Sequence, residues 1–210
     1  MPPIAFRLQL VTDRSLVRGE SLSAAIQAAA DAGAPAIQLR ERDLPTRALL
    51  ALAEEIRSVT TPRGIPLLIN DRIDLAEALD LDGVHLRASS VPVSVARRMV
   101  GSRRILGVST HSIEEVRRAS GEGADYVIVG PVYDTPSKRQ YGAPLGLDRL
   151  ADAVRASSVP VFAIGGITRE RVKEVRRAGA FGVALIGGIL GHDDVSAATQ
   201  EMLAAVRDTI

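Results

Sequence analysis

Short apolar runs alternate with amphipathic stretches from one end of this 210-residue chain to the other. This alternation is typical of repeated strand–helix units whose strands run parallel. The expected strands are Arg7–Thr12, Ala36–Leu39, Pro66–Ile69, Gly83–Leu86, Ile105–Val108, Tyr126–Val129, Val159–Ile164 and Gly182–Ile186.

The stretches between these strands predict helices. In Thr46–Ser58, apolar residues at positions 49, 50, 52 and 56 fall on one side of a helix. Ser112–Ala119, Arg169–Ala178 and Val195–Asp208 show the same pattern, and glycines such as Gly33 stand where helix ends favour them.

Eight evenly spaced units, each with one strand and one helix, predict a closed (β/α)8 barrel that forms one domain over residues 1–210. The alternative is a doubly wound open sheet. Its dinucleotide fingerprint, GxGxxG after the first strand, is absent, because Thr12-Asp13-Arg14-Ser15 stands there.

Composition narrows the function classes. Hydrophobic residues make up 46% of the chain but aromatic residues only 3%, so we expect a core of Val, Ile, Leu and Ala. A net charge of +1 and few aromatics argue against a nucleic-acid partner. The chain has no cysteine, no signal-peptide pattern and no membrane-length apolar run. We therefore expect a soluble, cytoplasmic protein without membrane partners, and the sequence leaves homo-oligomerisation open.

Active sites of such barrels lie at the carboxyl ends of the strands, so the residues after each strand are the candidates. After strand 2, alternation sends Gln38 and Arg40 to one side, and Arg40 with Arg42 has the forked cations that grip a diphosphate. The alternative interpretation is a surface ion pair with Glu41 or Asp43.

Asn70 and Asp71 follow strand 3, where they either cap the next helix or supply a magnesium carboxylate beside a phosphate-orienting amide. The loop after strand 6 contains Thr135-Pro136-Ser137-Lys138, which is either a solvated turn or a ring of donors for an oxyanion. His85 is either a barrel-interior residue or functional, and His111 either begins a helix or shuttles protons.

Glycines follow the last two strands, in Gly165-Gly166 and Ile186-Gly187-Gly188. Exposed backbone N–H groups at helix starts in these positions form the recurrent phosphate site of such barrels. Tight turns are the alternative. The residues alone therefore predict a substrate with a monophosphate near strands 7 and 8 and a more highly charged group near strands 2, 3 and 6.

The same segments carry a family resemblance that covers nearly the whole chain. They are Gln38–Arg42, Leu68–Arg72, Gly83–Leu86, Gly107–Ser112, Gly123–Val127, Gly130–Tyr133, Thr135–Lys138 and Ala163–Ile167. Together they resemble the thiamine phosphate synthase/TenI superfamily. The resemblance implies a transferase of thiamine biosynthesis that joins hydroxymethylpyrimidine diphosphate to thiazole phosphate with the help of Mg²⁺ and releases pyrophosphate through a dissociative step.

By this resemblance, Gln38–Arg42, Asn70, Ser109 and Lys138 hold the pyrimidine diphosphate, and Asp71 holds Mg²⁺. Thr135, Pro136, Ser137, Gly166, Ile186 and Gly187 hold the thiazole phosphate. Catalysis is then mainly electrostatic, with Arg40 and Lys138 stabilising the departing charge.

Two positions depart from the family pattern. Arg42 replaces a lysine, and Ser90 replaces the aspartate that serves as the second magnesium carboxylate. The sequence leaves open whether Asp43 or Glu41 supplies the missing ligand instead. Loss of that carboxylate is typical of TenI-like thiazole tautomerases, in which His111 would be the acid–base residue. A non-catalytic regulator that binds thiazole phosphate is a third hypothesis. Retention of Asn70-Asp71 and the loop ending at Lys138 favours the synthase.

Overall fold

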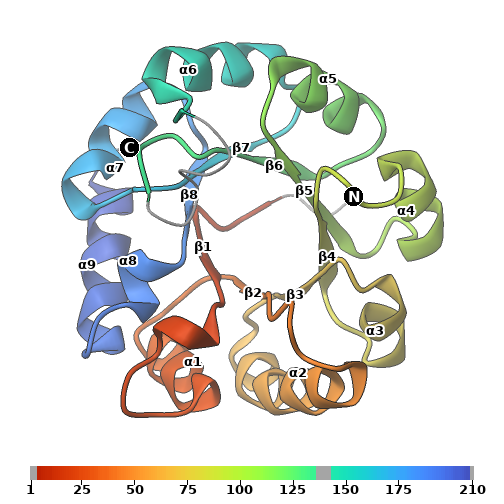
Figure 1. The fold of residues 1–210 in the computed structure, drawn as a ribbon, viewed down its shortest axis with the longest axis vertical. Coiled ribbons are helices and arrows are strands. Elements are labelled where there is room, and N and C mark those ends of the chain that lie inside the picture. The colour runs from red at the N-terminus through yellow and green to blue at the C-terminus, as the bar shows by residue number, and fades with distance from the viewer. Residues whose placement is uncertain (1–3, 136–142, 209–210) are drawn as a thin grey trace.

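The computed structural model describes residues 4–135 and 143–208. Eight parallel strands pair in chain order and close into a barrel, with β1 hydrogen-bonded to β8 (Figure 1). The strands are β1 Leu8–Val11, β2 Ile37–Leu39, β3 Leu67–Asn70, β4 Gly83–Leu86, β5 Ile105–Thr110, β6 Tyr126–Val129, β7 Val161–Ile164 and β8 Gly182–Leu185. The predicted (β/α)8 barrel is confirmed.

Helices form a ring around the strands (Figure 1). They are α1 Leu22–Asp31, α2 Thr46–Thr60, α3 Ile73–Ala78, α4 Val93–Val100, α5 Ile113–Gly121, α6 Gly146–Ala156, α7 Arg169–Arg177, α8 Gly187–Leu190 and α9 Val195–Arg207, with 3-10 turns η1 Arg14–Leu16 and η2 Thr61–Arg63. None of the helices in these described ranges is both long and apolar enough to cross a membrane.

Two details differ from the sequence-based prediction. The eighth unit contains two helices, because the four-residue α8 is too short and too glycine-rich to show helical periodicity. Strand β5 runs to Thr110, two residues beyond the predicted end, because Ser109 and Thr110 still pair with β6. Ser109 therefore lies within a strand, which fixes its direction more firmly than a loop would.

The core has two layers, because alternate strand residues point outward to the helices and inward to the barrel. The outer layer is aliphatic, as composition predicted, with residues such as Leu8, Leu10 and Ile26 fully buried. The inner layer contains aromatic rings: Tyr126 and Phe162 lie 5.2 Å apart between ring centres. Among the described residues, Phe6, Tyr126 and Phe162 belong to this inner layer, toward the amino ends of the strands.

Candidate active site

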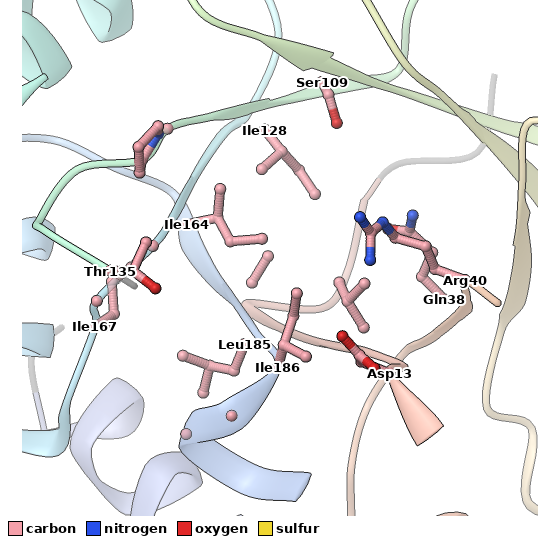
Figure 2. A pocket seen from close by; sticks show the side chains of 18 of the residues that line it. Asp13, Gln38, Arg40, Ser109, Ile128, Thr135, Ile164, Ile167, Leu185 and Ile186 are labelled. Atoms are coloured by element: carbon pink, nitrogen blue, oxygen red, sulfur yellow. The ribbon is translucent and has the colours of Figure 1, made fainter. Parts of the chain in front are cut away.

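A cavity of about 800 Å³ opens at the carboxyl ends of the strands. That volume suits a small organic substrate. Figure 2 shows Arg40 beside Gln38 on one side of the cavity, with Thr135 across from them. The predicted site residues that line it are Gln38, Arg40, Arg42, Asn70, Ser109, His111, Thr135, Gly166, Ile186 and Gly187. Pro136, Ser137 and Lys138 lie outside the described residues.

Arg40 presents a partly desolvated cation to this cavity. Burial lowers the pKa of its guanidinium, and the charge of Arg42 lowers it further. Within the described ranges no acidic side chain forms an ion pair with Arg40. A partly buried cation that makes no ion pair is stabilised when an anion binds there, so this residue suits an anionic ligand.

The acids next to Arg40 in sequence have another partner, which the sequence did not reveal. Both guanidinium nitrogens of Arg14 donate to Asp43 at 2.6 Å, and Arg14 Nη1 lies 3.2 Å from buried Glu41. Glu41 also accepts from Thr12 at 2.7 Å, and Thr12 Oγ1 accepts from the backbone N–H of Arg40 at 2.8 Å. These acids therefore brace the β2 loop, and the surface-pair interpretation of Arg40 and Arg42 is wrong.

Asp71 turns the chain after β3 in a left-handed conformation, with φ of 59°. Its carboxylate accepts from Arg87 Nε at 2.8 Å and from the hydroxyl of Ser90. It does not cap α3, since Arg72 holds the cap position and makes no side-chain cap bond. Arg87 lines the cavity and donates to Asp71, which itself does not line the cavity. The sequence had not marked Arg87 as a site residue.

The candidate magnesium ligands do not converge as a preformed set. Within the described residues, no group of three or more His, Asp or Glu side chains could hold a metal ion. Asp43 and Glu41 are both engaged by Arg14, as Asp71 is by Arg87. Asp71 is the one carboxylate at this corner that the sequence marked for a metal.

The two histidines near the strand ends differ in setting. His85 is buried inside the barrel, where burial and then the charge of Arg40 lower its pKa to about 3. His111 is exposed at the cavity rim, and its Nδ1 lies 2.7 Å from the carbonyl of Gly130. Since a carbonyl only accepts, Nδ1 carries a proton and donates this hydrogen bond.

Glycine backbone lines the other side of the cavity. Gly166 has φ of 63°, and an added Cβ would lie 2.7 Å from the carbonyl oxygen of Asp134. Gly187 and Gly188 are the first residues of α8, so their N–H groups have no partner within that helix. The guanidinium of Arg171, which the sequence did not single out, donates to the Gly166 carbonyl at 2.6 Å and also lines the cavity.

One cavity is thus lined by two kinds of group. Cationic and amide side chains face it from the ends of β2 and β3, and glycine backbone faces it from the ends of β7 and β8. The fold and this arrangement define a (β/α)8-barrel protein whose candidate site suits a phosphorylated small molecule.

Known proteins place the chain in a family. The family model described as thiamine monophosphate synthase matches residues 8–189. A thiamine-phosphate synthase of Chloroflexus aurantiacus is 43% identical over 98% of this chain and 95% of its own length. One from Roseiflexus castenholzii is 45% identical over 92% and 85%. The chain belongs to the thiamine monophosphate synthase family.

Solved structures agree. A thiamine phosphate pyrophosphorylase from Pyrococcus furiosus superposes with a TM-score of 0.88 at 33% identity, covering 97% of this chain and 96% of that one. A 3-hexulose-6-phosphate synthase superposes with a TM-score of 0.73 at 19% identity, covering 96% and 100%, which shows the shared barrel alone.

Proposed function

We propose that this protein is a thiamine-phosphate synthase that joins hydroxymethylpyrimidine diphosphate to thiazole phosphate. The observation that carries the proposal is the division of one cavity between Arg40 with its amide neighbours and the glycines after β7 and β8. Family membership and the names of relatives at 43% and 45% identity support the same reaction. A cytoplasmic location stays a prediction from the sequence.

Arg40 would bind the diphosphate together with Arg42, Gln38 and Asn70. In the reaction, the bond between the pyrimidine methylene carbon and the diphosphate oxygen breaks, and pyrophosphate leaves with the electron pair. The thiazole nitrogen then donates its lone pair to that carbon. Negative charge grows on the departing oxygens, so a guanidinium already removed from water stabilises the transition state more than an exposed one would. Lys138 is predicted to assist, from outside the described residues.

The thiazole phosphate would lie against the backbone of Gly166, Ile186 and Gly187, with the hydroxyl of Thr135 opposite. All four residues line the cavity. Because glycine has no side chain, phosphate oxygens approach the N–H groups closely. Holding the two substrates in one cavity turns a collision in solution into a reaction between neighbours.

Asp71 would hold magnesium. Magnesium is commonly held by one or two carboxylates plus substrate phosphates, so the one carboxylate of Asp71 could hold an ion that arrives with the diphosphate. Its positive charge would offset that of the leaving group. Since Asp71 is paired with Arg87 in the free protein, that ion pair would open first, with Arg87 turning to the diphosphate.

The coupling assay, which measures pyrophosphate release with both substrates present, tests this assignment in Arg40→Gln. We expect kcat/KM for the pyrimidine diphosphate to fall by roughly a hundredfold, the scale of losing one preorganised electrostatic group. Arg103→Gln is the matched control, because Arg103 is 78% exposed and pairs with Asp80 before β5, away from the cavity. Equal rates in the two variants would remove Arg40 from the proposed role. A tautomerase or a regulator would release no pyrophosphate at all.

A further inference from the structure

A short chain of hydrogen bonds lies inside the barrel beneath the cavity. The hydroxyl of Tyr126 on β6 lies 3.1 Å from Nδ1 of His85 on β4. Nε2 of the same imidazole lies 2.9 Å from the hydroxyl of Ser109 on β5. His85 and Ser109 line the cavity, where Figure 2 shows the Ser109 hydroxyl, whereas Tyr126 is fully buried and does not line it. Tyr126 therefore reaches the cavity through His85.

Gly107 makes this connection possible. It stands on β5 between the other two strands, in register with His85 on one side and Tyr126 on the other. A Cβ at Gly107 would lie 2.4 Å from the Tyr126 hydroxyl and 2.5 Å from His85 Nδ1. Any larger residue would occupy the space that the hydrogen bond crosses, so the bond depends on a glycine here.

Tyr126 and His85, the two titratable groups in this series of hydrogen bonds, are both neutral near pH 7. Burial raises the pKa of the Tyr126 hydroxyl, so the phenol keeps its proton. Burial lowers the pKa of His85 to about 3, so the imidazole carries a single proton. A neutral imidazole donates from one nitrogen and accepts at the other.

The surroundings of Gln9 determine which group donates and which accepts in the hydrogen bonds between Tyr126, His85 and Ser109. Gln9 Nε2 donates to Gln38 Oε1 at 2.9 Å, and the buried Gln9 Oε1 accepts no hydrogen bond. Since Gln9 Oε1 takes no hydrogen bond from Tyr126, the acceptor within reach of the phenol proton in the described part of the chain is Nδ1 of His85. His85 then carries its proton on Nε2 and donates to Ser109 Oγ. The proton of Ser109 is left to donate into the cavity.

The hydrogen bonds between the neighbouring amide side chains of Gln9, Gln38 and Asn70 also run from donor to acceptor toward the cavity. Gln38 Nε2 donates to Oδ1 of Asn70 at 3.2 Å, which leaves the NH₂ group of Asn70 to donate. Asn70 and Ser109 both line the cavity beside Arg40. This corner of the cavity therefore offers hydrogen-bond donors and a cation, which suits ring nitrogens and diphosphate oxygens and disfavours groups that only donate.

We propose that Tyr126 is a positioning residue that acts through His85 to hold the Ser109 hydroxyl as a hydrogen-bond donor toward an acceptor on the pyrimidine diphosphate. The substrate in this proposal rests on the proposed function, whereas the direction of the hydrogen bonds does not. A group already oriented before the substrate arrives spends no free energy on turning during the reaction.

The first test does not depend on enzymatic activity. The nitrogen NMR spectrum of ¹⁵N-histidine-labelled protein distinguishes protonated from bare imidazole nitrogens, and spectra of His111→Gln and His192→Gln assign the His85 signals. We expect a proton on Nε2 and none on Nδ1 at pH 7, and a loss of this preference in Tyr126→Phe. A proton on Nδ1 in the wild type would mean that Ser109 donates to His85 and Gln9 accepts from Tyr126, which overturns the proposed direction.

The second test is a double-mutant cycle with Tyr126→Phe and Ser109→Ala in the coupling assay. Phenylalanine keeps the ring against Phe162, so the thermal unfolding midpoint reports whether packing is preserved. We expect Tyr126→Phe to lower kcat/KM for the pyrimidine diphosphate about tenfold, to leave KM for thiazole phosphate unchanged, and to have little further effect in the Ser109→Ala background.

Additive effects of the two substitutions would show that Tyr126 does not act through Ser109 and would overturn the positioning role. If the wild type couples no substrates, the proposed function fails, while the NMR result still decides the direction of the hydrogen bonds.

Discussion

The hydroxyl of Ser90 donates to Oδ1 of Asp71. Ser90, which stands where the family resemblance implies a second magnesium carboxylate, is therefore in contact with Asp71, to which the resemblance assigns the metal. A carboxylate at position 90 would lie beside Asp71, where the repulsion between two negative charges is relieved by a divalent cation.

Ser90→Asp should accordingly lower the magnesium concentration needed for half-maximal pyrophosphate release, by roughly tenfold, because a hard cation gains an anionic oxygen ligand. The measurement is the rate of coupling against magnesium concentration at saturating substrates. Ser90→Asn is the matched control, since it adds similar bulk without charge and should not shift the curve toward lower magnesium. An unchanged requirement in Ser90→Asp would place the ion elsewhere.

Gly187 offers a cleaner test of the monophosphate site than Gly166. At Gly166 any side chain collides with the Asp134 carbonyl, whereas a Cβ at Gly187 meets only Leu16 Cδ1, at 3.6 Å. Gly187→Val should fold and should weaken thiazole phosphate binding tenfold or more, about 1.4 kcal/mol, because the branched side chain keeps phosphate from the backbone. Calorimetry measures the affinity.

The control for this substitution is Gly121→Val at the end of α5, where no atom lies within 4 Å of an added Cβ. It should bind thiazole phosphate as the wild type does. If Gly187→Val binds equally well, the phosphate lies away from the start of α8.

Burial of neutral His85 should make stability depend on pH. Its pKa in the folded protein is about 3, far below the value of about 6.5 for an unfolded chain. The unfolded state therefore binds an extra proton between these values. Stability is fully present above about pH 6.5 and is lost as the pH falls toward 3, by up to about 1.4 kcal/mol per pH unit.

Urea unfolding of the metal-free protein between pH 7 and 5 measures this slope, in a range above the ordinary titration of carboxylates. In His85→Gln the slope should be smaller, although the variant is less stable overall. The same slope in both proteins would mean that His85 is not the group responsible.

Asp125 should matter for stability and not for activity, because it precedes β6 at the end of the barrel opposite the cavity. Its side chain is 2% exposed and accepts from Arg97 at 2.5 Å and from the backbone of Leu106 at 2.7 Å. Asp125→Ala leaves the buried Arg97 without its counter-ion and should cost roughly 3–5 kcal/mol of unfolding free energy.

Asp152→Ala removes an exposed pair with Arg155 and should cost at most about 1 kcal/mol. Denaturant unfolding compares the two variants. A fall in kcat/KM per folded Asp125→Ala molecule would argue against the separation of stability and activity between the two ends of the barrel.

Strand positions were predictable because a run of apolar residues between amphipathic stretches has few alternatives. Seven of the eight predicted strands end within one residue of the observed end, and the order of strands around the barrel follows chain order. Since parallel strands share one carboxyl end, residues such as Arg40, Asn70 and Ser109 could be assigned to one cavity from their place after or near a strand end.

Partners of these side chains were not predictable. Alternation along a strand tells which side a residue faces but not which neighbour it meets across the barrel. The pairing of Arg14 with Glu41 and Asp43, and of Arg87 with Asp71, joins segments 16 to 29 residues apart in sequence. The link from Tyr126 to Ser109 through His85 was missed for the same reason.

The central claim is that this chain couples a pyrimidine diphosphate to a thiazole phosphate. The most direct measurement mixes the purified protein with both substrates and magnesium, and quantifies pyrophosphate and thiamine phosphate together. Synthase activity predicts that the two products appear in equal amounts and that neither forms when one substrate is omitted. Absence of both products at every magnesium concentration, with thiazole tautomerisation that requires His111, would contradict it.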